Sequence, residues 1–405
     1  MDLQELLQQS MSYRNKDGSY NRLRKAKDDS FEIKDDLSDD IQELLNSGEE
    51  GIKHIDAILK TAVDKDASDV HIMANCPPKF RVDGKLVPMP GYGVFTKEDT
   101  KEILIHTIED EETANIFEVD GDLDFAYTVG GVGRFRVNLY KQKSSWAGVF
   151  RKLSTNIPKP SQLGLPQSVI NLNDLKRGLV LVTGPTGSGK STTLASIIDL
   201  INTNSYRNVI TLEDPIEYVH QSKLCNVAQR EMGVDSKNFA SALRAALRED
   251  PDVILVGEMR DYETISTAVT AAETGHLVFS TLHTIGATAT IDRILDTYPP
   301  QQQEQARSQL AVCFQGIVSQ QLIPKVGGGR VAAFEIMIGN DPIRALIREG
   351  KTEQLATYIQ NGRNEGMCLM DDFILALLTK NQITAEQAML FSVDKKKFKE
   401  RMKGY

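Results

Sequence analysis

The chain has 405 residues, of which 40% are hydrophobic and 25% charged, and its formal net charge is −9. This composition is typical of a folded protein of two or three domains and excludes a fibrous or wholly disordered chain. The acidic balance argues against a nucleic-acid-binding protein, because such proteins carry a basic excess or a concentrated basic face.

Neither membrane insertion nor secretion is expected. No apolar run approaches the roughly 20 residues that a membrane-spanning helix needs. The first ten residues hold acids and glutamines where a signal peptide would have basic residues and then an apolar stretch. The four cysteines are scattered singly, which indicates neither a disulfide framework nor a paired-cysteine metal site. We therefore expect a protein of the reducing cytoplasm.

The first 50 residues differ in composition from the rest of the chain. They contain 13 acids and 7 bases, so most of the net charge falls in this segment. Few of its residues are large and apolar. We interpret residues 1–50 as an acidic extension that is mostly disordered.

A small α+β domain is predicted over residues 51–152. A helical pattern at 52–65 precedes strand-like segments at 68–72 and 79–82, and β-type alternation returns between 123 and 151. Asp-Gly and Gly-Gly pairs between the strand-like segments are signals for tight hairpin turns.

The rest of the chain is predicted to form a linker, an α/β core and a helical end. Three prolines in the middle of residues 153–167 disfavour helix, so we expect a linker there. From 168 to 340, short β-branched runs alternate with glycine-rich turns and helical stretches, which predicts a largely parallel sheet. Residues 341–405 have helical patterns, and their end, from 394 to 403, holds six bases and two acids.

The segment GPTGSGKST has the pattern of a phosphate-binding loop. It follows a buried-strand pattern and precedes a helix, which is the context that such a loop requires. Glycines let backbone N–H groups face phosphates, and the helix adds its positive end. We expect the Lys190 ammonium to reach the β- and γ-phosphates of ATP and the Ser191 hydroxyl to ligate Mg²⁺. The predicted nucleotide-binding residues of the loop are Gly184, Pro185, Thr186, Gly187, Ser188, Gly189, Lys190, Ser191 and Thr192.

Carboxylates follow two further strand patterns. Glu258 ends an apolar run, a position from which it can face the γ-phosphate, and we assign it as the general base or the residue that positions water. Glu213, Asp214 and Glu217 follow the apolar run 209–212. They can hold Mg²⁺ through water or position the attacking water, and Asp214 is the one we assign to Mg²⁺. Without the phosphate loop, the same acids would be interpreted as solvated turn residues.

Two histidines bracket the strand pattern at 277–282. His283 follows this strand, where it can contact the γ-phosphate or respond to its presence, and His276 precedes it. Histidines are also common as ordinary polar residues, so the two residues by themselves leave both interpretations open.

Four motifs, taken in this order, resemble a known family: GPTGSGKSTT, ITLEDPIEY, ALREDPDVILVGEMRD and TAAETGHLVFSTLHT. They are similar to the secretion ATPase superfamily of hexameric motors, and most similar to its type IV pilus retraction (PilT-type) branch. The segments ASDVHI, PPKFRVDG and GRFRVN resemble the N-terminal domain of that branch, and GGGRVAAFEIMIG resembles its C-terminal part. The resemblance runs from about residue 52 to 390.

The resemblance implies an α/β fold with a RecA-like P-loop NTPase core, preceded by a small PAS-like α+β domain and followed by a helical C-terminal part. It implies that Glu258 is the catalytic glutamate of an atypical Walker B strand, and that residues 213–217 and 276–283 form an acidic box and a histidine box. It also implies that arginines of the N-terminal domain contact the nucleotide phosphates, for which a guanidinium is well suited. The matching positions are Arg136 and Arg151, with Arg134 as a third candidate.

The expected activity is ATP hydrolysis, with Mg²⁺, that powers pilus retraction in twitching motility. The resemblance implies a homohexamer at the inner face of the cytoplasmic membrane, with an inner-membrane pilus platform protein and a second pilus ATPase as partners.

Other functions stay open at this point. An accessory retraction ATPase would carry the same motifs. Pilus assembly and type II secretion ATPases resemble a longer chain with an extra N-terminal domain and a paired-cysteine zinc insert, and this sequence shows neither. A nucleotide-dependent regulatory module is the alternative from another class, but it would not need Glu258 or the arginines. The acidic balance disfavours a DNA-translocating motor.

Overall fold

A computed structural model describes residues 54–402, apart from residues 83, 109, 154 and 155. The chain divides into two compact units, Met1–Thr155 and Asn156–Tyr405. The predicted acidic extension, residues 1–50, lies outside the described residues.

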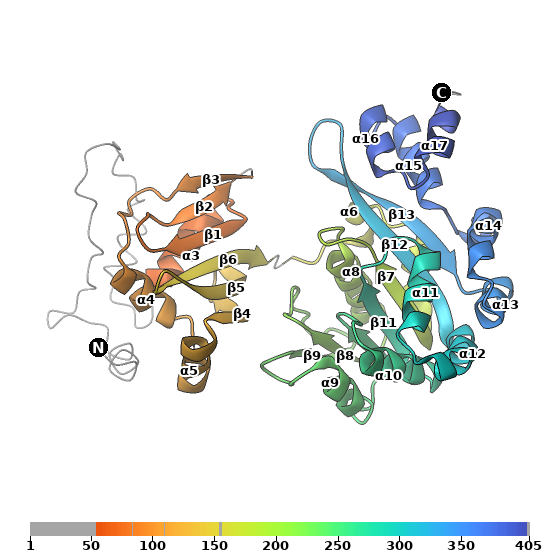
Figure 1. Ribbon diagram of the computed structural model, residues 1–405, viewed down its shortest axis with the longest axis horizontal. Helices are drawn as coiled ribbons and strands as arrows, with labels where there is room; N and C mark the ends of the chain where they lie inside the picture. Colours follow the sequence, from red (N-terminus) through yellow and green to blue (C-terminus); the bar gives the residue numbers. More distant parts are fainter. Residues whose placement is uncertain (1–53, 83, 109, 154–155, 403–405) are drawn as a thin grey trace. The chain divides into compact units, whose positions relative to one another are not determined.

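The first unit is built on a six-stranded antiparallel sheet with the strand order β3-β2-β1-β6-β5-β4 (Figure 1). Tight turns join β2 to β3, β4 to β5 and β5 to β6, as the Asp-Gly and Gly-Gly pairs predict at the first two positions. The elements of this unit are α3 (His54–Asp64), β1 (Asp69–Met73), β2 (Lys79–Val82), β3 (Lys85–Pro88), α4 (Lys97–Ile105), α5 (Glu111–Asp120), β4 (Asp122–Val129), β5 (Gly133–Gln142) and β6 (Ser145–Leu153).

Three helices, α3, α4 and α5, supply the core of the first unit together with one face of its sheet. Phe135, Val137 and Leu139 of β5 are buried in one cluster with apolar side chains of all three helices. Successive side chains of a strand point to opposite faces. Arg134 and Arg136 therefore lie on the face of the sheet that does not carry this core.

The second unit contains a seven-stranded sheet with the order β13-β12-β7-β11-β10-β8-β9. The pairing of β12 with β13 is antiparallel, and all other pairings in this sheet are parallel. The predicted parallel sheet is thereby confirmed. Its strands are β7 (Gly178–Thr183), β8 (Asn208–Glu213), β9 (Asn226–Glu231), β10 (Val253–Val256), β11 (Leu277–Leu282), β12 (Phe314–Pro324) and β13 (Arg330–Ile338).

Helices cover both faces of the second sheet (Figure 1). Val180 and Val182 of β7 are buried against α8, whereas Leu179 and Leu181 face the cluster that contains α10 and α12. The helices are α6 (Pro160–Leu163), α7 (Gln167–Ile170), α8 (Lys190–Asn204), α9 (Phe239–Ala246), α10 (Tyr262–Glu273), α11 (Ala287–Asp296), α12 (Gln303–Cys313), α13 (Asp341–Glu349), α14 (Leu355–Asn361), α15 (Met370–Thr379), α16 (Ala385–Phe391) and α17 (Lys395–Met402). Among the described helices, none combines the length and apolar character that a membrane crossing requires.

The last three helices pack on the hairpin that β12 and β13 form. Ile323 and Ala333 of the hairpin share a buried cluster with Ile374 of α15, Ala388 of α16 and Phe398 of α17. The predicted helical C-terminal region is confirmed. Strand β12 therefore connects the parallel sheet to these helices.

The prediction that prolines disfavour helix between residues 153 and 167 is wrong at α6. This helix begins at Pro160, one of the three prolines. Proline is tolerated in the first turn of a helix, because an N–H group there has no partner within the helix.

Candidate nucleotide site

The carboxyl ends of four parallel strands meet at one edge of the second sheet. The pairing aligns Thr183 of β7 with Leu282 of β11, and Val256 of β10 with Leu212 of β8. In open α/β sheets, ligands bind at this edge. The segments that leave β7, β11, β10 and β8 begin at residues 184, 283, 257 and 214, so the phosphate-loop pattern, His283, Glu258 and the acidic segment come together here.

The phosphate loop has a backbone conformation that depends on glycine. The φ angles of Gly184, Gly187 and Gly189 are +141°, +76° and +90°, values that other residues rarely adopt. A Cβ atom on Gly184 would lie 2.2 Å from the carbonyl oxygen of Gln320, and one on Gly189 would lie 2.8 Å from the Nε2 atom of Gln320. Helix α8 begins directly after the loop, so its first unpaired N–H groups add to an anion-binding site.

Gln320 of β12 packs closely against the phosphate loop, and the sequence analysis did not identify it. Its side chain is only 3% exposed, and its Oε1 atom accepts a hydrogen bond of 2.8 Å from the hydroxyl of Thr193 in α8. The two residues are 127 positions apart in the chain. The local sequence, SQQL, carries no signal that separates Gln320 from a surface glutamine.

Lys190 is the first residue of α8, and its ammonium group lies over the phosphate loop. It donates hydrogen bonds to the carbonyl oxygens of Gly184 and Pro185, at 2.9 and 3.2 Å. Burial lowers the pKa of Lys190, whereas the negative charges of Glu258 and Glu217 act in the opposite direction. The two predicted carboxylates are thus close enough to interact with this ammonium.

Glu258 lies just beyond β10, between a cation and a histidine. Its Oε2 atom accepts a hydrogen bond of 2.7 Å from Arg260, and its Oε1 atom is 3.2 Å from Nε2 of His283. Partial burial would raise the pKa of Glu258, but Arg260, with His283, outweighs burial and holds that pKa below its ordinary value. These contacts therefore favour the ionised, carboxylate form of Glu258. Sequence reasoning missed Arg260, although its position two residues after Glu258 was a signal.

Glu213 ends β8 in a more enclosed environment. Its Oε1 atom accepts hydrogen bonds from the Thr211 hydroxyl at 2.6 Å and from Nε2 of Gln229 at 3.0 Å. Burial raises the pKa of Glu213, and these two hydrogen bonds act against that increase. Glu213 and Ser191 line the same small pocket, of about 40 Å³, together with Tyr218.

The oxygen atoms at this edge fit a magnesium ion that arrives with a nucleotide. Mg²⁺ is usually bound by one or two protein oxygens, by water and by substrate phosphates. Ser191 and Glu213 offer such oxygens in one pocket, and Asp214 and Glu217 follow Glu213 in the chain. Among the described residues, no three His, Cys, Asp or Glu side chains are grouped to hold a metal by themselves.

Within one chain, His276 lies away from the phosphate loop and the carboxylates described above. It precedes β11, whose first residue, Leu277, pairs with Gly178 at the start of β7. His276 is therefore at the amino edge of the sheet, opposite the phosphate loop, and its Nδ1 atom is 2.9 Å from the carbonyl oxygen of Ala271. Only His283, at the other end of the same six-residue strand, joins the site.

The three predicted arginines belong to the first unit, and two of them form a row with an acid. The register pairs Arg136 of β5 with Arg151 of β6, and Arg151 with Asp69 of β1. Nε of Arg151 donates a hydrogen bond of 2.9 Å to Asp69. Burial would raise the pKa of Asp69, but the hydrogen bonds from Arg151 and Ser68 lower it below its ordinary value. Arg134 is two residues from Arg136 and shares its face.

Residues 165–370 match the family model described as "Type II/IV secretion system protein". The chain is 47% identical over 339 residues to the "Type IV pilus retractation ATPase PilT" of Pseudomonas aeruginosa, which covers 82% of this chain and 96% of the relative. It is 42% identical over 335 residues to the "Twitching motility protein" of Neisseria gonorrhoeae, and the match covers 82% of this chain and 88% of the relative. The crystal structure of "the Pilus Retraction Motor PilT and Bound ADP" aligns with a TM-score of 0.81 and 48% identity, over 86% of this chain and 100% of that chain.

The chain belongs to the type II/IV secretion system protein family. Within it, the extent of the similarity makes the chain a PilT-type secretion ATPase. The family resemblance and the fold class expected from the sequence are confirmed, and so is a nucleotide as the ligand of this class of protein.

We expect Arg260→Gln to raise the pKa of Glu258, because the change removes a hydrogen bond and a positive charge. If ionised Glu258 is needed for turnover, the acidic limb of the pH–turnover profile moves to higher pH. The shift should be small, because solvent screens the exposed Arg260 side chain. Steady-state ATP turnover at a series of pH values measures it. The matched control is Arg244→Gln, whose partner on the surface is Glu263; it should leave the limb in place. An unmoved limb in Arg260→Gln would contradict the expectation.

Proposed function

We propose that the chain is a motor that hydrolyses ATP and uses the energy to retract a type IV pilus. The observation that supports hydrolysis is the convergence of Lys190, Glu258 and Glu213 at one sheet edge beside the phosphate loop. A nucleotide switch needs the phosphate loop but has no need of carboxylates that activate water. Retraction is supported by the names of the relatives, which refer to pilus retraction and twitching motility.

In this proposal, each group at the edge has a separate task. The loop N–H groups and Lys190 bind the β- and γ-phosphates and offset their charge. Glu258 orients the attacking water and accepts its proton, and His283, which contacts Glu258, interacts with the γ-phosphate. Glu213 and Glu217 supply two further carboxylates to the site.

Mg²⁺ is the proposed cofactor. The Ser191 hydroxyl would hold it directly, and Glu213 or Asp214 would do so through water. When bound, the ion offsets phosphate charge and stabilises the charge that develops during phosphoryl transfer.

We expect Glu258→Gln to separate binding from hydrolysis. The substitution keeps the size of the side chain and removes the base, so turnover should fall by about 100-fold or more while ATP affinity changes little. Phosphate release measures the first quantity and calorimetry measures the second. Lys190→Ala is the comparison variant, and it should weaken nucleotide binding itself. Turnover near that of the wild type in Glu258→Gln would favour the regulatory module over the motor.

We further propose a homohexamer in which the N-terminal arginines contact nucleotide. Arg134, Arg136 and Arg151 share the face of the first unit that is free of the core helices. A guanidinium there can meet phosphate charge without competing with core packing.

We expect Arg136→Ala to lower turnover by about 10³-fold, the low end for an arginine that stabilises transferring phosphate. For the wild type, turnover per subunit should rise with protein concentration as hexameric rings form. Light scattering on the same samples measures the oligomeric state. Arg81→Ala is the matched control, because Arg81 pairs in register with Asp69 at the far end of the same row. If Arg136→Ala and Arg81→Ala had equal activity, Arg136 would not be part of the nucleotide site.

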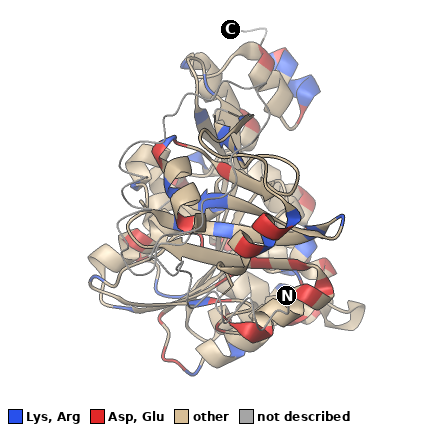
Figure 2. Cartoon of the chain, turned by 90° about the vertical axis from the view of Figure 1, so that its left-hand side faces the viewer, with Lys and Arg blue, Asp and Glu red and all other residues tan. Residues whose placement is uncertain are grey.

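The proposed place of action is the inner face of the cytoplasmic membrane, on a platform protein and alongside a second pilus ATPase. Helix α17 supports this location, because it is rich in lysine and arginine, the residues coloured blue near the C-terminus in Figure 2. Lys395, Lys396 and Lys399 are exposed, and the described part of the chain provides no ion pair for them. Leu390 and Val393 nearby are 66% and 62% exposed. Basic and apolar groups together favour an anionic lipid surface.

We expect the chain to sediment with vesicles that contain phosphatidylglycerol, and not with phosphatidylcholine vesicles. Reversing Lys395, Lys396 and Lys399 to Glu should abolish binding, since each base contributes about 1 kcal/mol at such a surface. The control variant replaces three exposed lysines outside α17 with glutamate: Lys85, Lys176 and Lys237. Equal binding of the two triple variants would contradict a role for α17.

A further inference from the structure

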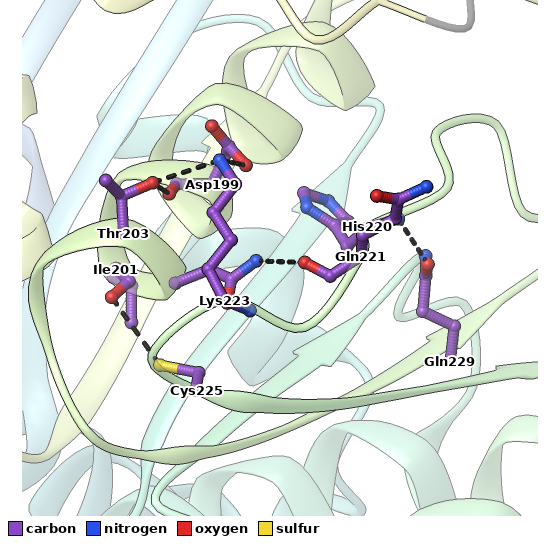
Figure 3. A network of polar contacts seen from close by, with 9 residues as sticks. Asp199, Ile201, Thr203, His220, Gln221, Lys223, Cys225 and Gln229 are labelled. Carbon is purple, nitrogen blue, oxygen red and sulfur yellow. Dashed lines mark hydrogen bonds and ion pairs between the residues drawn. The ribbon is translucent and has the colours of Figure 1, made fainter.

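The Gln229 side chain makes three hydrogen bonds to the acidic segment and the residues that follow it. Gln229 lies on β9, in register with Thr211 of β8. Its Nε2 atom donates to Oε1 of Glu213 at 3.0 Å and to the carbonyl oxygen of Tyr218 at 2.9 Å. Its Oε1 atom accepts a hydrogen bond of 2.6 Å from the backbone N–H of His220 (Figure 3). One side chain thus ties the carboxylate to the backbone five to seven residues further on.

A primary amide is the side chain that suits these three partners. The carboxylate and the Tyr218 carbonyl need donors, and the His220 N–H needs an acceptor. An amide supplies two N–H donors and one carbonyl oxygen in a single rigid plane. A glutamate at this position would place a carboxylate, which only accepts, against the Glu213 carboxylate and the Tyr218 carbonyl, which also only accept. An apolar side chain would make no hydrogen bond to any of the three groups.

The donor from Gln229 matters because Glu213 occupies an unfavourable place for negative charge. Glu213 is only partly exposed, and its Oε1 atom accepts hydrogen bonds from the Thr211 hydroxyl and from Nε2 of Gln229. These two neutral donors therefore stabilise the ionised form where the chain offers Glu213 no ion pair among the described residues.

The segment that Gln229 binds is also fastened to the helix of the phosphate loop. The hydroxyl groups of Tyr218 and Thr192 are 2.9 Å apart. Further along, the Asn202 side chain of α8 donates to the carbonyl oxygen of Gln221 at 2.8 Å and accepts from the backbone N–H of Lys223 at 3.0 Å. The segment after the acidic residues is thus held between β9 on one side and α8 on the other.

We propose that Gln229 is a positioning residue of the catalytic site: it orients Glu213 toward the pocket that Glu213 shares with Ser191, and it fixes Tyr218 against the first turn of α8. Gln229 acts through Glu213 and does not itself touch the nucleotide. This inference rests on the proposed function, in which Glu213 acts on Mg²⁺ or on the attacking water.

The test compares Gln229→Met with Asn226→Met and Glu213→Gln. Methionine keeps the length of glutamine and removes both donors and the acceptor. Asn226 is the matched control, since it lies on the same strand and donates to Asn208, away from the site. Two quantities are measured: the affinity for ADP by calorimetry, with and without Mg²⁺, and the Mg²⁺ concentration that gives half-maximal ATP turnover.

Gln229→Met should weaken ADP binding by about tenfold when Mg²⁺ is present, as loss of an outer-shell partner does, and should leave Mg²⁺-free binding unchanged. The Mg²⁺ concentration that gives half-maximal ATP turnover should rise by a similar factor. Asn226→Met should match the wild type in both measurements. If Gln229→Met is too unstable to study, Gln229→Asn retains an amide, is too short to reach Glu213, and should change both quantities in the same direction.

Two negative outcomes are distinguishable. If Glu213→Gln is impaired while Gln229→Met and Gln229→Asn retain wild-type affinity and the wild-type Mg²⁺ dependence of turnover, the positioning role is overturned and the function of Glu213 stands. If Glu213→Gln itself behaves as the wild type, the proposed role of Glu213 fails, and the role of Gln229 fails with it. A loss of thermal stability alone in Gln229→Met counts against the proposal, because a merely structural residue would produce that result.

Discussion

The register of four parallel strands, β7, β11, β10 and β8, is the constraint on which the site depends. Because Thr183 lies beside Leu282 and Val256 beside Leu212, segments that are far apart in the chain leave the sheet at one edge. A slip of one residue would turn each strand's side chains to the other face and displace Glu258 from the loop. Apolar cores on both faces of the sheet resist such a slip, so the packing of the unit also fixes the geometry of its chemistry.

Two carboxylates at this edge have opposite surroundings. Partial burial is outweighed at Glu258 by Arg260 and His283, which keep its pKa low, whereas burial dominates at Glu213, whose hydrogen bonds from Thr211, Gln229 and the backbone of Glu217 come from neutral donors. Environments that push two pKa values apart allow two acids to perform different tasks at one pH. The division of labour proposed for these residues, a base at Glu258 and a partner of the metal or water at Glu213, follows from that difference.

Local patterns in the sequence predicted the phosphate loop, the alternation of strands and helices, and the carboxylates that follow β8 and β10. Gln320 and Gln229 could not be predicted, because their importance comes from contacts with residues that only the folded sheet brings near them. The sequence pattern placed His283 after the strand and His276 before it, but grouped both with the nucleotide. The parallel pairing of β11 with β7 puts the two histidines at opposite edges of the sheet.

The hairpin of β12 and β13 gives the phosphate loop a mechanical connection to the end of the chain. Gln320, under the loop, is three residues from Ile323, which is buried among α15, α16 and α17. A tilt of the hairpin would carry the Gln320 carbonyl toward or away from Gly184, where no space remains for a single additional carbon atom. A load applied to the C-terminal helices is therefore borne by the same strand that shapes the anion cradle, and strain can pass between the two in either direction.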